Sequence, residues 1–232
     1  MEIIKKHPVR WAAVILEWLI FFLFTALVMF VDVRPIGPEA SSVGFASLNQ
    51  WVAKAFPYRP FFHKISDYLG YLAILLDGTF ALIALSQWIS RRKLWAVDHN
   101  LLFLMFFYTV VVIIYFACTK IVINYRPVIL ESEGGLESSY PSSHTVLAVA
   151  SFYTAVLNIH VLLKKENLQK LANALCTFFG IALILSRVAS GIHWFTDIIG
   201  SLLLIASLVM TYLAALTAPA SAGHYQGKRV SK

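Results

Sequence analysis

Long apolar stretches alternate with short polar segments along this chain. Six of the apolar stretches are of similar length, at roughly 11–31, 68–89, 101–121, 144–163, 170–189 and 195–217. A helix of about 20 mostly apolar residues is long enough to cross the hydrocarbon core of a bilayer. The pattern therefore predicts an all-α integral membrane protein with six transmembrane helices.

Composition agrees with this prediction. Of the 232 residues, 59% are hydrophobic and only 13% are charged, and the mean hydropathy is +0.73. This leaves too little polar surface for an ordinary soluble enzyme, and too much apolar sequence for a disordered tail. The net charge of +7 would suit a nucleic-acid-binding protein, but the basic residues fall in short clusters between apolar runs, as in membrane proteins. We therefore expect a membrane and no nucleic acid as partner.

The basic residues also predict an orientation. Twelve of the 19 lie in the N-terminus, the 90–100 and 164–170 segments and the C-terminal tail: Lys5, Lys6, Arg10, Arg91, Arg92, Lys93, Lys164, Lys165, Lys170, Lys228, Arg229 and Lys232. The opposite set carries seven, spread over more residues: Arg34, Lys54, Arg59, Lys64, Lys120, Arg126 and Arg187. The positive-inside rule then places both termini in the cytoplasm of a plasma-membrane protein.

No repeat or linker divides the chain, so we expect one membrane domain over 1–217 and a polar tail over 218–232. The basic start resembles a signal peptide, but the first apolar stretch is too long for one, and we interpret it as a retained helix. The long 32–67 segment interleaves aromatic and basic residues, including Trp51 and Lys54. Two interpretations stay open: short amphipathic helices in the lipid headgroup layer, or an aromatic loop packed on its own helices.

The densest polar cluster lies between the last two apolar stretches. His193 and Asp197 are four residues apart, so they share one face if the segment is helical. The carboxylate can then fix the imidazole tautomer and leave the other ring nitrogen free as a nucleophile. Arg187, upstream of Gly191, can reach the same place and bind a phosphate group. A structural ion pair at a helix cap is the alternative for His193 and Asp197.

Two further clusters flank other apolar stretches. Ser142, Ser143 and His144 directly precede the fourth stretch, where free helix N–H groups attract anions and a histidine can act as general acid. Ordinary helix capping by the serines is the alternative. Lys120 and Arg126 lie at the end of the third stretch with no acid adjacent in sequence, and they bind either an anionic ligand or lipid headgroups.

The predicted topology brings all three clusters to the same, outer face of the membrane. Together they supply three cations for a phosphate group, two histidines and an aspartate that orients one of them. These residue types predict a phosphoryl-transfer site that works without a metal ion or other cofactor.

The same residues resemble the motifs of a known family. Arg126-Pro127, the run from Pro141 to His144, and the Ser186-Arg187-x5-His193-x3-Asp197 series resemble the type 2 phosphatidic acid phosphatases, the PAP2 superfamily. The motifs extend from Lys120 to Asp197, and the number of spans is similar over the whole chain. The sequence departs from the family at two points. Five residues, one fewer than usual, separate Lys120 from Arg126, and Ser143 stands where the family usually has glycine.

The resemblance implies a mechanism and the role of each residue. His193 attacks phosphorus and forms a phosphohistidine, with Asp197 orienting the ring. His144 protonates the leaving group and then activates water. The phosphate oxygens are held by Lys120, Arg126, Arg187, Ser142 and Ser143.

The leading functional hypothesis is therefore a lipid phosphatase of the outer membrane face. The candidate substrates are undecaprenyl diphosphate, phosphatidic acid and phosphatidylglycerol phosphate, and the compact loops favour the polyprenyl diphosphate. A lipid phosphotransferase with the same site is the alternative within this chemistry. A transporter or a lipid-binding scaffold is the alternative outside it, and no oligomeric state is indicated.

The remaining polar residues are given structural roles. Glu17 and Asp77 lie deep in the first two stretches, where we expect them to pair with hydroxyls or amides of other helices. His63 has no evident partner and is interpreted as an interfacial or loop residue. Glu137 lies in an acidic stretch beside the cation cluster, which forms either a lid that shapes entry or a solvated loop.

Overall fold

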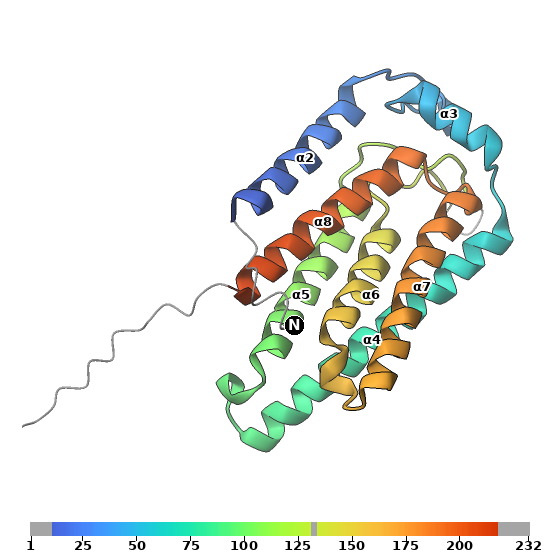
Figure 1. The fold of residues 1–232 in the computed structure, drawn as a ribbon. Coiled ribbons are helices and arrows are strands. Elements are labelled where there is room, and N and C mark those ends of the chain that lie inside the picture. Colours follow the sequence, from blue (N-terminus) through green and yellow to red (C-terminus); the bar gives the residue numbers. More distant parts are fainter. Residues whose placement is uncertain (1–10, 131–133, 218–232) are drawn as a thin grey trace, which may run out of the picture.

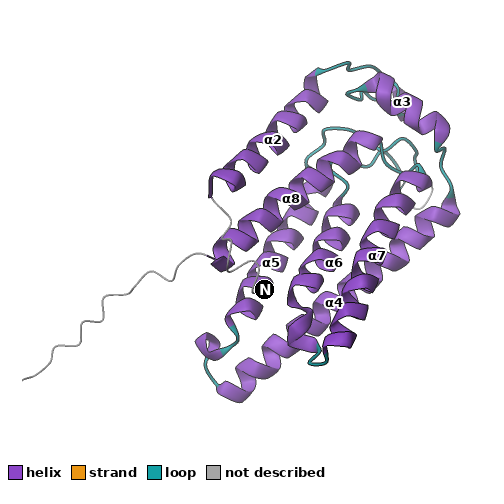
Figure 2. Ribbon diagram, in the orientation of Figure 1, coloured by secondary structure: helices purple, strands orange, loops and turns teal. Residues whose placement is uncertain are grey.

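Six long helices form a bundle in the computed structural model, which describes residues 11–130 and 134–217 (Figure 1). They are α2 (Trp11–Phe30), α4 (Pro60–Arg91), α5 (His99–Lys120), α6 (Ser143–Leu162), α7 (Glu166–Ser190) and α8 (Phe195–Thr217). The short elements are α3 (Ala46–Ala55) and two 3-10 helices, η1 (Pro38–Ala40) and η2 (Leu94–Ala96). The described residues contain no β-strand, and Figure 2 shows only helices and loops. All six long helices are long and apolar enough to cross a membrane, so the predicted fold class is confirmed.

The second span begins earlier than hydropathy predicts. It starts at Pro60 rather than near residue 68, and proline suits the first turn of a helix because its fixed φ is already helical. The added turns carry polar residues, which lower the local hydropathy and conceal the helix start. As a result, His63 and Asp67 stand on a rigid helix rather than in a loop.

α6 and α8 form the buried centre of the bundle. α6 contacts α4, α5, α7 and α8, while α2 packs against α8 at the edge (Figure 1). Small side chains such as Ala148 and Ala155 are fully buried on α6, and they allow neighbouring helix backbones to approach closely. Large apolar side chains on the outer helices are exposed, among them Phe22, Leu82 and Phe178, as expected of a surface that faces lipid.

The three polar clusters come to one end of this bundle. α5 and α7 end there, and α4, α6 and α8 begin there, as the chain order of alternating spans requires. The basic 90–100 and 164–170 segments lie at the opposite end. The other cations of the predicted cytoplasmic set (Lys5, Lys6, Arg10, Lys228, Arg229 and Lys232) and the 218–232 tail lie outside the described residues.

The 32–67 segment contains a helix that is tied to the start of α8. α3 crosses the end of the bundle that carries the polar clusters (Figure 1). The buried Asn49 amide donates to Thr196 Oγ1 at 2.9 Å, and Thr196 N donates to Asn49 Oδ1 at 3.2 Å. Trp51 and Phe61 instead remain about 70% exposed. The segment is thus anchored through Asn49, and the Arg59 backbone N–H also donates to the Ser190 carbonyl at 2.9 Å. A headgroup position for its aromatic side chains stays a prediction.

The polar residue deep in the second span has a partner on another helix. Ser151 on α6 donates a hydrogen bond to Asp77 on α4 at 2.6 Å. This is the type of pairing expected for an acid among apolar helices, and it links α4 to the central helix.

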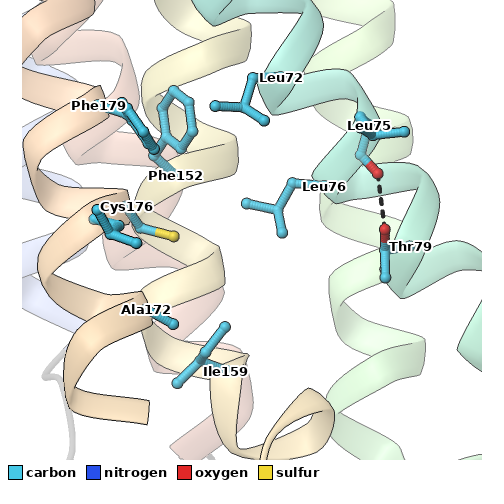
Figure 3. Close-up of a pocket in the computed structure, with 10 residues that line it drawn as sticks. Leu72, Leu75, Leu76, Thr79, Phe152, Ile159, Ala172, Cys176 and Phe179 are labelled. Atoms are coloured by element: carbon cyan, nitrogen blue, oxygen red, sulfur yellow. Dashed lines mark hydrogen bonds between the residues drawn. The ribbon is translucent and has the colours of Figure 1, made fainter. Parts of the chain in front are cut away.

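An apolar groove of about 260 Å³ lies between α4, α6 and α7 (Figure 3). Its walls include Leu72, Phe152, Cys176 and Phe179. Its one hydroxyl, on Thr79, donates to the Leu75 carbonyl of its own helix at 2.9 Å. The groove therefore offers no free hydroxyl to a ligand.

Gly200 lets Tyr140 pack against α8. A Cβ at Gly200 would lie 2.4 Å from the Tyr140 ring, whose hydroxyl is 2.8 Å from Thr25 Oγ1 on α2. We expect Gly200→Ala to lower the free energy of unfolding by about 1–3 kcal/mol because the ring must move. The measurement is thermal unfolding in detergent. Gly78→Ala is the matched control, since a Cβ there meets nothing within 4 Å. Equal stability of the two variants would contradict this packing.

Candidate active site

His193 and Asp197 meet at the start of α8, with a serine hydroxyl between them. His193 lies in the short loop before α8 and is 8% exposed, and Asp197 is fully buried. Their nearest atoms, Nδ1 and Oδ2, are 3.6 Å apart. Ser139 Oγ lies 3.1 Å from His193 Nδ1 and donates a short hydrogen bond to Asp197 Oδ2. The predicted pair is thus brought together, but through a third residue.

The environment of His193 favours its neutral form. Burial lowers the pKa of the imidazole well below its ordinary value, and the positive charges of Arg187 and Arg126 lower this pKa further. The contact with Asp197 is therefore not a salt bridge at neutral pH. A neutral ring keeps a lone pair on one nitrogen, as a nucleophile requires.

Arg187 reaches the site from the last turn of α7. Its side chain is buried, and one terminal nitrogen lies 3.7 Å from Asp67 Oδ1 on α4. The helix ends at Gly191, whose φ of +64° is readily adopted only by glycine. A Cβ there would also lie 2.5 Å from the Phe56 carbonyl oxygen. This turn places Arg187 and His193 on either side of the reversal between the last two spans.

Arg126 is held by an acid from a distant part of the same loop. Its guanidinium lies 2.5 Å from Glu137 Oε2, and its backbone N–H donates to the Glu137 carbonyl at 3.0 Å. The interpretation of Glu137 as part of a solvated loop is therefore wrong, because its carboxylate forms an ion pair with a site cation. Tyr125 and Ser138 form an isolated antiparallel bridge beside this pair. The two halves of the loop are thereby joined.

The start of α6 supplies the second histidine. Ser142 is the N-cap residue, but its hydroxyl accepts a hydrogen bond from Thr145 Oγ1 at 2.9 Å and caps no backbone N–H. Side-chain capping by Ser142, one of the two interpretations, is therefore not observed. Ser143 is half-buried beside His193 in one cavity. His144 stands edge-on to Tyr115, with ring centroids 5.6 Å apart.

Lys120 is placed differently from the other predicted phosphate ligands. It is exposed at the last residue of α5, whereas its neighbours Cys118 and Thr119 line the cavity. α5 ends at Lys120 and the chain from Ile121 to Arg126 is not helical, so the two cations are separated by a loop and do not share a helix face.

Two cavities are lined by four of the eight predicted site residues, Arg126, Ser143, His144 and His193. One, of about 300 Å³, is lined by Arg126, Glu137, Ser139, Ser143 and His193. The other, of about 370 Å³, is largely apolar and is lined by His144 and Asp67 together with Tyr71, Tyr115 and Phe116.

Four buried nitrogen atoms of the site have no hydrogen-bond partner among the described residues. They are Arg126 Nε, His144 Nδ1, Arg187 Nε and His193 Nε2. A buried polar atom normally has a partner, because leaving it unpaired costs free energy. The two guanidinium N–H groups can donate to an oxyanion, while an imidazole nitrogen can donate or accept according to its protonation. In the part of the chain that the structure describes, no group of three or more His, Cys, Asp and Glu side chains is arranged to hold a metal ion.

Several residues of the site were not recognised from the sequence. They are Ser139 and Asn124 beside Asp197, Asp67 beside Arg187, and His63. His63 Nε2 lies 3.5 Å from Asp67 Oδ2, so its interpretation as a residue without a partner is wrong. The sequence does contain a signal for this pair, because His63 and Asp67 have the same four-residue spacing as His193 and Asp197. Ser139 and Asn124 carry no such signal.

Comparisons with known proteins agree with this geometry. The family model described as PAP2 superfamily matches residues 100–220, which is more than half of the chain. A solved structure with a similar fold is titled "Crystal structure of the first transmembrane PAP2 type phosphatidylglycerolphosphate phosphatase from Bacillus subtilis". It superposes with a TM-score of 0.56 at 17% identity and covers 86% of this chain and 93% of that chain. No curated protein sequence matches the chain.

The neutral state of His193 is directly measurable. We expect its ring to stay neutral as the pH falls through 6.5, because burial and the nearby arginines lower its pKa. Below pH 6.5 the unfolded chain then binds a proton at this residue that the folded chain does not, so the free energy of unfolding falls as the pH decreases. Histidine ¹⁵N NMR in detergent, with the signals assigned by His193→Gln, measures the titration. Protonation of the His193 ring at pH 6.5 or above would contradict this electrostatic environment.

Proposed function

This chain belongs to the PAP2 superfamily, and from that membership we propose that it is a metal-independent lipid phosphatase that works through a phosphohistidine on His193. The proposal is carried by the free Nε2 of a neutral His193, which lies in one cavity with Arg126 and Ser143. Its other ring nitrogen is already bonded to Ser139. This arrangement leaves one lone pair available to attack phosphorus.

In the first step, Nε2 of His193 bonds to phosphorus as the bond to the leaving oxygen breaks. His144 donates a proton to that oxygen. Arg126 and Arg187 hold the phosphoryl oxygens through guanidinium donors, including the unpaired Nε groups, and stabilise the charge that develops there. Each arginine is already oriented by a carboxylate, Glu137 or Asp67.

In the second step, His144 accepts a proton from water, which attacks the phosphohistidine and releases inorganic phosphate. Asp197 stabilises the positive charge of the phosphorylated ring. Ser142 and Ser143 contribute at the start of α6, where helix N–H groups attract anions. Lys120 approaches the phosphate only if its exposed side chain turns toward the cavity. We therefore assign it the most peripheral of the phosphate contacts.

The substrate is proposed to be a lipid whose phosphate reaches the site from the membrane. The largely apolar cavity beside His144, bounded by Tyr71, Tyr115 and Phe116, can accept the apolar part of such a molecule. Undecaprenyl diphosphate, phosphatidic acid and phosphatidylglycerol phosphate all combine a phosphate group with a long apolar part. The compact loops make the polyprenyl diphosphate the first substrate to test. The positive-inside rule supports a plasma-membrane protein with cytoplasmic termini and an extracytoplasmic site.

Phosphate release by purified protein tests the function. We expect the parent protein to release phosphate from at least one of the three lipids, and His193→Ala to lower the rate by at least about 1,000-fold, because no nucleophile remains. His99→Gln, at the opposite end of the bundle, is the matched control and should keep the parent rate. Transfer of phosphate to a second lipid without free phosphate would favour the phosphotransferase. An active His193→Ala variant would exclude the phosphohistidine.

The response to a chelator and to vanadate tests the mechanism separately. Since His193 is the nucleophile and arginines supply the positive charge, activity should persist within about twofold in excess EDTA. Vanadate should inhibit, because it adopts the five-coordinate geometry of the transition state and such analogues bind more tightly than substrates. The assay measures phosphate release with each reagent. Loss of activity in EDTA that added divalent metal restores would contradict the mechanism.

A further inference from the structure

Ser139 connects the two residues that carry the proposed chemistry. It is 1% exposed and lies in the loop between α5 and α6, separate from the loop that carries His193. Its Oγ contacts His193 Nδ1 at 3.1 Å and Asp197 Oδ2 at a shorter distance. The direct separation of the histidine from the aspartate is 3.6 Å, too long for a good hydrogen bond.

The hydroxyl has one proton, and this decides the direction of both bonds. A carboxylate only accepts, so Ser139 donates its proton to Asp197. The oxygen of Ser139 then accepts from His193, which places the imidazole proton on Nδ1. The lone pair of the neutral ring is consequently on Nε2, the nitrogen without a partner among the described residues.

The surroundings hold Ser139 and Asp197 in this arrangement. The Ser139 backbone N–H donates to the Asn124 carbonyl at 2.8 Å, and the Asn124 amide donates to Asp197 Oδ1 at 3.3 Å. The Trp194 backbone N–H donates to Asp197 Oδ2 at 2.9 Å. With its oxygens occupied in this way, Asp197 cannot approach His193 without breaking hydrogen bonds that are buried and expensive to lose.

We propose that Ser139 is a positioning residue through which Asp197 acts on His193, an inference that rests on the proposed phosphatase function. During attack, the Nε2–phosphorus bond forms, the bond from phosphorus to the leaving oxygen breaks, and that oxygen takes its proton from His144. Nδ1 keeps its proton throughout. The positive charge that appears on the ring strengthens the hydrogen bond to Ser139, which in turn is polarised by the Asp197 carboxylate.

Two substitutions at Ser139 test its proposed positioning role. Ser139→Ala removes the hydroxyl, and Ser139→Cys keeps the approximate volume but offers only a weak donor and acceptor. We expect kcat to fall by about 10–100-fold in both, the usual effect of removing a group that orients a reactive side chain. Phosphohistidine formation in a single turnover should slow by the same factor. Inhibition by inorganic phosphate should stay within about twofold, because the arginines that bind it are unchanged.

Ser207→Ala is the matched control. It deletes another buried hydroxyl on α8, one that donates to the Leu203 carbonyl of its own helix at 2.9 Å, and it should keep the parent kcat. A kcat equal to that of the parent protein in either Ser139 variant would overturn the proposed positioning role. So would a loss of inhibition by phosphate as large as the loss of kcat. If the parent protein itself releases no phosphate from any lipid, the proposed function fails instead, which separates the two conclusions.

A double substitution tests whether Asp197 acts through Ser139. Ser139→Ala is combined with Asp197→Asn, and phosphohistidine formation is measured for both single variants and for the pair. If the carboxylate works through the hydroxyl, the double variant should be no more than about threefold slower than the slower single variant. Losses that multiply would mean that the two residues act independently, and the proposal would be wrong.

Discussion

The buried carboxylate of Asp197 is the group on which the arrangement of this site depends. An acid with no exposure, at the end of an apolar bundle, must have its oxygens hydrogen-bonded. The donors come from two loops: Asn124 and Ser139 lie between α5 and α6, and the Trp194 backbone lies directly before α8. Satisfying one carboxylate therefore joins the loop between α5 and α6 to the loop before α8. The same bonds determine where His193 stands.

The two arginines of the site follow a related rule. Arg126 and Arg187 each have one terminal nitrogen beside a carboxylate, Glu137 or Asp67, while each Nε remains unpaired among the described residues. A carboxylate behind a guanidinium reduces the cost of burying its charge and orients its plane. The remaining donors are then available to an oxyanion. In the proposed function, the two acids orient the guanidinium groups, and the unpaired Nε groups remain to donate to the phosphoryl oxygens.

The division of the molecule into an apolar exterior and one polar end explains how such a site exists in a membrane protein. Side chains such as Phe22 and Phe178 are exposed because lipid is their solvent, whereas α6 and α8 are buried and carry polar residues at their starts. All six long helices begin or end at the polar end, and α3 covers part of it. The loop between α5 and α6 and the loop before α8 then bring distant motifs within hydrogen-bonding distance, with rigid helices limiting their movement.

The lengths of the apolar stretches predicted the six spans, because bilayer thickness imposes a similar length on every crossing helix. It missed the start of α4 at Pro60, where polar turns continue a helix that hydropathy alone does not detect. Motif spacing identified His193, Asp197 and Arg187, since residues one helical turn apart or flanking a glycine turn have a local geometry. Only the tertiary structure placed Ser139 between His193 and Asp197 and left Lys120 exposed. These outcomes depend on how separate loops pack, and no local spacing encodes the distances between their atoms.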